Sequence, residues 1–154
     1  MGGMSMHTSL GRKLHNPNAG LLALRLAFGL FIMTFGVIKL LGWKPMFAQV
    51  GAAMDTFGIH SHHVVWGFMC ALVESVGGLL VILGLFFRVA ALLLFCNMVV
   101  ACTLMWHGGP DTASAAALSG WMQGFAEPFA FGVAFLAMML LGPGRFALDN
   151  DGGL

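Results

Sequence analysis

Charged side chains inside long apolar runs are the residues of this chain best suited to chemistry. Glu74 lies about ten residues from the nearer end of its run, roughly 15 Å deep if the run is helical at 1.5 Å per residue. A carboxyl group at that depth cannot reach water, so it must form an ion pair, line a wet cavity or stay protonated. Because ionisable residues inside a membrane are costly, Glu74 is the first candidate for a functional site.

Two polar stripes are predicted to face each other across neighbouring helices. One recurs at three- and four-residue steps, the spacing of one helix face, and comprises Arg25, Gly29, Ile32, Gly36 and Lys39. On the next run Glu74 shares a face with Gly77 or Gly78, and glycines let helices approach closely. We expect Lys39 to reach toward Glu74, and Arg25, near the other end, to extend to lipid phosphates.

Three further residues complete a set of ligand or proton-relay candidates. Glu127 and Gln123 lie one turn apart near the start of the last run, and His107 ends the third. Together with Lys39 and Glu74 they fall at similar depths, which predicts a cavity open to the outer face. The simpler interpretation is that Lys39 and Glu74 form a structural ion pair that fixes helix register.

A metal site is not favoured by the sequence. His60, His62 and His63 have metal-like spacing on a loop, but no carboxylate or thiol is expected near them and they remain weak candidates. The three cysteines form no Cys-x-x-Cys pair. No covalently bound cofactor is expected, and no catalytic residue is assigned.

The composition requires a lipid environment. Of 154 residues 59% are hydrophobic and 8% charged, against about 25% charged in soluble domains. With a net charge of +1 and no basic stripe, nucleic acid is not an expected partner. Four apolar runs approach the roughly 20 residues that a bilayer requires, at about 21–41, 64–87, 89–106 and 121–141.

The fold class is therefore all-α, a bundle of four transmembrane helices. We divide the chain into a tail (1–18), a membrane domain (19–149) and a short tail (150–154). Arg88 alone would separate the second and third spans. With Arg12, Lys13 and Arg145 it places most positive charge on one side, so both termini should be cytoplasmic. The tryptophans mark the opposite ends of the spans: Trp43, Trp66, Trp106 and Trp121.

Several short motifs together resemble the DoxX family of small four-helix membrane proteins. They cover most of residues 20–149 and comprise Leu24-Arg25-Leu26 with Gly36, Lys39-Leu40, Gly42-Trp43, Glu74 with Gly77-Gly78-Leu79-Leu80, Leu83-Gly84-Leu85, Arg88 with Ala90-Ala91, and Leu140-Leu141-Gly142-Pro143-Gly144-Arg145-Phe146 before Leu148-Asp149. The resemblance marks Lys39, Glu74 and Arg145 as motif positions without a settled role. Arg25, Gly36, Gly77, Gly78 and Arg88 are taken as structural.

The resemblance implies redox work at a membrane. Relatives include a membrane subunit of an archaeal thiosulfate:quinone oxidoreductase, and some members associate with thiol and oxidative-stress enzymes. We therefore expect a redox-associated subunit, at most part of a quinone-linked oxidoreductase, in a bacterial cytoplasmic (inner) membrane. It would bind a quinone in the outer-half cavity and receive electrons from an enzyme partner; a homo-oligomer is also compatible. Two alternatives stay open, a non-catalytic scaffold or assembly partner and a small transporter or metal-handling protein.

Overall fold

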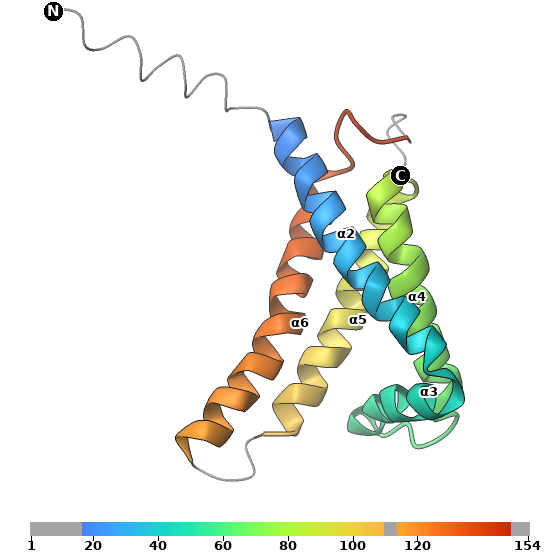
Figure 1. The fold of residues 1–154 in the computed structure, drawn as a ribbon, viewed down its shortest axis with the longest axis vertical. Helices are drawn as coiled ribbons and strands as arrows, with labels where there is room; N and C mark the ends of the chain where they lie inside the picture. The colour runs from blue at the N-terminus through green and yellow to red at the C-terminus, as the bar shows by residue number, and fades with distance from the viewer. Residues whose placement is uncertain (1–16, 110–113, 149–154) are drawn as a thin grey trace, which may run out of the picture.

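The computed structural model describes residues 17–109 and 114–148, and within them it is helical (Figure 1). Four helices are long and apolar enough to cross a membrane: α2 (Pro17–Leu41), α4 (His63–Leu83), α5 (Phe87–His107) and α6 (Ala115–Leu141). Between α2 and α4 lie the short helix α3 (Trp43–Gly51) and the 3-10 helix η1 (Ala52–Phe57). This confirms the predicted all-α fold with four membrane-spanning helices.

The helix ends differ from the approximate predicted spans, and α2 begins at Pro17 rather than at 21. The second helix stops at Leu83, because Gly84 takes a left-handed conformation, with φ of 72°, and caps it. The connection to α5 is therefore Gly84–Phe86, and Arg88 lies in the first turn of α5 instead of forming the turn alone. The fourth helix begins at Ala115, six residues before the predicted 121. The side chain of Ser114 accepts a hydrogen bond from the Ala117 amide and so caps the start of the helix.

The four spans pack as two pairs. α2 packs mainly on α4 and α5 mainly on α6, whereas α2 meets α6 through a few side chains, chiefly phenylalanine rings. Figure 1 shows the two pairs close together near the described N-terminal residues and diverging toward α3 and the start of α6. Arg12, Lys13 and the ends of both predicted tails lie outside the described residues, and the cytoplasmic placement of the termini stays a prediction.

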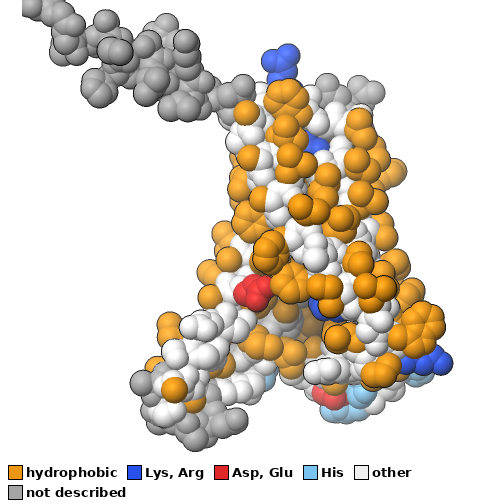
Figure 2. All heavy atoms as spheres, in the orientation of Figure 1, with side chains coloured by type: hydrophobic (Ala, Val, Ile, Leu, Met, Phe, Trp, Pro, Cys, Tyr) orange, Lys and Arg blue, Asp and Glu red, His pale blue; other side chains and the backbone are white. Residues whose placement is uncertain are grey.

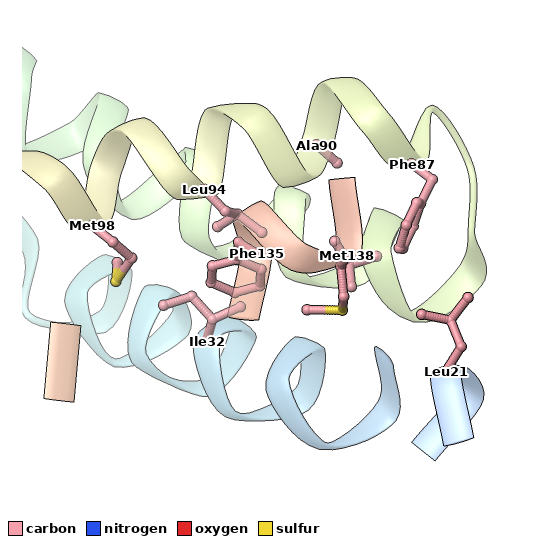
Figure 3. Close-up of a cluster of buried hydrophobic side chains, with 9 residues drawn as sticks. Leu21, Ile32, Phe87, Ala90, Leu94, Met98, Phe135 and Met138 are labelled. Atoms are coloured by element: carbon pink, nitrogen blue, oxygen red, sulfur yellow. The ribbon is translucent and has the colours of Figure 1, made fainter. Parts of the chain in front are cut away.

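The hydrophobic core fills the half of the bundle where the pairs converge. Its members come from all four spans (Figure 3): Leu21, Ile32, Val81, Phe87, Ala90, Leu94, Met98, Phe135 and Met138. The opposite half carries the four tryptophans, and we call it the tryptophan end. Since the core does not extend there, the diverging pairs leave room between them.

Arg25 is buried in the converging half of the bundle and holds α2 to the ends of α4 and α6; we call these contacts the Arg25 clamp. The prediction that Arg25 extends to lipid phosphates was wrong. Its side chain is 1% exposed. It donates to the carbonyls of Val81 and Ile82 at 3.0 and 2.8 Å, and to that of Pro143 at 2.9 Å. These carbonyls lie at the end of α4 and just beyond α6, where helical partners run out. Arg25 thereby ties three segments together.

We predict that Arg25→Met lowers the free energy of unfolding by about 3 kcal/mol, because buried carbonyls lose a charged donor. Chemical unfolding in detergent micelles measures the change. The matched control is Arg88→Met, whose side chain is exposed and which should cost little. Equal losses in the two variants would contradict the clamp.

Candidate functional site

The centre of the site is an ion pair between α2 and α4. The Lys39 ammonium lies 2.6 Å from Oε1 and 2.7 Å from Oε2 of Glu74. Glu74 is 2% exposed and Lys39 22%. Both oxygens therefore share one cation, which offsets the cost of placing a carboxylate at this depth.

Two more side chains surround Glu74. The amide of Asn97, on α5, donates to Oε1 at 2.9 Å. The thiol of Cys70, one turn before Glu74, lies 3.6 Å from the same oxygen and 3.7 Å from the Lys39 nitrogen. Asn97 was not among the predicted site residues, although an amide within an apolar span is itself a signal that a polar partner is near.

Close packing of α2 on α4 brings Lys39 within hydrogen-bond distance of Glu74. Gly36 faces the Ala71 carbonyl and the backbone nitrogen of Ser75, and a side chain at Gly36 would collide with both. Lys39 follows one turn later on the same face, and Glu74 precedes Ser75. Gly78 similarly faces Gly29 across the pair of helices. The glycine stripes thus set the helix separation that the ion pair requires.

A cavity of about 410 Å³ lies on one side of the ion pair. This lateral cavity is enclosed by α4, α5, α3 and η1, and its lining is mostly apolar: Val50, Gly51, Ala53, Met54, Trp66, Met69, Val73, Leu93, Val100, Ala101 and Leu104. Its polar groups are Lys39, Cys70, Glu74, Cys96 and Asn97. Trp66, Met69 and Leu93 are also exposed on the flank of the bundle, so the cavity opens sideways toward lipid.

A second cavity, of about 270 Å³, lies on the other side of the same ion pair. This central cavity lies between the two helix pairs and is lined by Ile32, Phe35, Lys39, Glu74, Met98, Ala101, Met105, Gly124, Glu127, Pro128 and Phe131. Figure 2 shows an acidic side chain beside a hollow with basic atoms at its edge, about midway along a face whose other charged side chains lie nearer its ends. Lys39 and Glu74 therefore form part of the wall of both cavities.

The other predicted ligands lie apart from this wall. Gln123 and His107 are exposed near the tryptophan end, and neither lines the two cavities. Only Glu127 joins Lys39 and Glu74, across the central cavity. Arg145 is exposed, and its backbone amide donates to the Asn18 side chain at 3.3 Å.

The prediction that no carboxylate lies near the histidines of the loop was wrong. Asp55, on η1, accepts hydrogen bonds from His60 Nδ1 at 3.0 Å and His63 Nε2 at 2.8 Å. His62 takes no part in this cluster. Among residues 17–109 and 114–148, no three His, Cys, Asp or Glu side chains are grouped to hold a metal ion.

The Asp55 cluster ties η1 to the start of α4, and η1 supplies Ala53 and Met54 to the lateral cavity. The hydrogen bond from His63 is the largest cause that holds the pKa of Asp55 below its usual value, with a further contribution from His60. A carboxylate whose pKa is lowered by folding stabilises the fold above its unfolded pKa. That contribution is lost as the pH falls through its folded pKa.

The site can thus offer hydrogen bonds to a carbonyl-bearing ligand at the end of an apolar cavity. Lys39 and Asn97 supply donors, and Glu74 supplies a proton acceptor. The pair carries no net charge when both members are ionised, so a neutral ligand can approach without meeting an uncompensated charge.

For the ion pair we predict that Lys39→Met lowers the free energy of unfolding by about 3–5 kcal/mol, because it leaves a buried carboxylate unpaired. The double variant Lys39→Met/Glu74→Leu should recover most of that loss. A double-mutant cycle measured by chemical unfolding tests this, with Lys44→Met on the exposed face of α3 as control. Additive losses in the double variant would contradict the coupling.

For the Asp55 cluster we predict that amide hydrogen exchange across η1 accelerates as the pH drops below the lowered pKa of Asp55, after correction for the intrinsic exchange rate. Asp55→Asn should exchange faster at neutral pH and lose this acid dependence. Exchange measured by mass spectrometry provides the readout, and α4 beyond its first turns serves as internal control. An unchanged acid response in Asp55→Asn would show that another group is responsible.

Comparison with known proteins adds one finding. The family model described as DoxX matches residues 20–108, which contain α3 to α5 and most of α2, and hence Lys39, Glu74 and Asn97. No curated protein and no solved structure matches the chain. Glu127, on α6, lies outside the matched residues.

Proposed function

The chain belongs to the DoxX family, and on that premise we propose that it is a redox-associated membrane subunit that binds a quinone in the lateral cavity. The observation that carries this proposal is the position of Glu74 and Lys39. Glu74 is buried and Lys39 half-buried within apolar spans, yet both line cavities instead of being sealed by packing.

The shape and polarity of the lateral cavity support a quinone. Its volume of about 410 Å³ falls within the range of ligand sites, which are mostly apolar with a few convergent polar groups. A quinone headgroup needs donors for its carbonyls, and Lys39 and Asn97 provide them. The sideways opening, with Trp66, Met69 and Leu93 at its rim, lets an isoprenoid tail remain among lipid chains.

In this proposal the chain's own residues handle protons and orient the ligand, and a partner protein supplies the electrons. Electrons would come from a redox partner protein, while Glu74 holds or releases a proton beside the quinone oxygen. In this proposal Lys39 orients the headgroup by exchanging part of its contact with Glu74 for the ligand carbonyl. The purely structural ion pair remains the competing interpretation, and it differs in predicting no bound ligand.

We predict that decyl-ubiquinone quenches the fluorescence of Trp66, which lines the lateral cavity. Glu74→Gln should weaken binding about tenfold, because it disturbs the charged donor and acceptor pair. Val100→Phe should abolish binding by filling the cavity. Trp66→Phe assigns the quenched tryptophan, and Lys44→Met serves as the control with unchanged affinity.

The outcome separates the two interpretations. Saturable quenching that is lost on cavity filling supports a quinone site. Equal and negligible quenching in wild type and Glu74→Gln, with both proteins folded, would leave a structural ion pair and contradict the proposed function.

A further inference from the structure

The central cavity combines a mostly apolar lining with three charged side chains that can hold water. Lys39, Glu74 and Glu127 reach it from α2, α4 and α6, and its volume of about 270 Å³ exceeds the roughly 30 Å³ that one water occupies in liquid. Water enters such a cavity where polar groups offer it two to four hydrogen bonds, and the three charged side chains can offer them here.

The backbone of α6 adds another acceptor to this cavity. Pro128 has no amide hydrogen, so the carbonyl of Gly124, four residues earlier, lacks its usual helical donor. Both Gly124 and Pro128 line the central cavity. A water molecule there can supply the missing hydrogen bond.

Glu127 differs from Glu74 in its surroundings. Glu74 is buried against Lys39 and Asn97, whereas the side chain of Glu127 is exposed. Glu127 is the sixth residue after Trp121, which places it about 9 Å inside the tryptophan end at 1.5 Å per residue. An exposed carboxyl group at that depth needs either water or a proton.

We propose that the central cavity is a water-filled vestibule open to the tryptophan end, in which Glu127 exchanges protons with that water. The charged groups that face Glu127 across the cavity are Lys39 from α2 and Glu74 from α4. α5 contributes only Met98, Ala101 and Met105, which carry no charge.

With the vestibule, the ion pair borders water in the central cavity and lipid in the lateral cavity. Protons reach Lys39 and Glu74 through the central cavity, while a lipid-soluble ligand reaches them through the lateral cavity. This role in proton delivery rests on the proposed function, because a quinone that is reduced beside the ion pair takes up protons. Its tests need no quinone, so failure of quinone binding and failure of the vestibule are distinguishable.

The first test measures water access. Glu127→Cys and the matched control Phe129→Cys are prepared in a cysteine-free background and placed in phosphatidylcholine nanodiscs. Phe129 is 55% exposed on α6 but does not line the cavity. A membrane-impermeant charged methanethiosulfonate should modify Glu127→Cys at least about tenfold faster, since thiol reactivity follows access to water and ionisation. Equal rates would overturn the vestibule.

The second test uses the otherwise unaltered chain. Dicyclohexylcarbodiimide, which reacts with protonated carboxyl groups, should modify Glu127 in nanodiscs at a rate that falls as the pH rises. Peptide mass spectrometry locates the adduct, and Glu127→Gln should remove it. Glu74 should stay unmodified while Lys39 holds it. Modification of Glu74 in place of Glu127, or no dependence on pH, would overturn Glu127 as the proton-exchanging acid.

Discussion

The ion pair between Lys39 and Glu74 is the interaction on which the rest of the site depends. A carboxylate at membrane depth is unstable alone, and its cation must come from a neighbouring helix at hydrogen-bond distance. Glycines at Gly36 and Gly78 bring that helix close enough. Because the pair satisfies itself, the bundle can leave space on both sides of it without leaving a buried charge unpaired.

The distribution of packing explains why that space exists. The core and the Arg25 clamp hold the converging half of the bundle, and the two helix pairs then diverge (Figure 1). The tryptophan end is consequently less filled, and α3 and η1 cover part of it. One half of the molecule provides stability, and the other provides the cavities.

Sequence analysis predicted the features that depend on local pattern. Hydropathy identified four spans. The three- and four-residue spacing of polar residues and glycines predicted that Glu74 and Lys39 face neighbouring helices. The end of α4 was misplaced because Leu85, Phe86 and Phe87 are as apolar in a turn as in a helix. The start of α6 was misplaced because its first turn, before Trp121, was taken as a loop rich in small residues. The Arg25 clamp could not be found this way, since its acceptors are backbone carbonyls 56 to 118 residues away. The hydrogen bonds of Asp55 to His60 and His63 were missed because the chain turns back between η1 and α4 to make them.

The central claim is that the ion pair borders an occupied ligand site. Native mass spectrometry of the full chain released from mild detergent tests it most directly, with lipid extraction and metal analysis of the same sample. The account predicts a quinone mass retained by wild type and lost from the cavity-filled Val100→Phe. A chain that carries no small molecule, or one that retains metal in place of quinone, would contradict it.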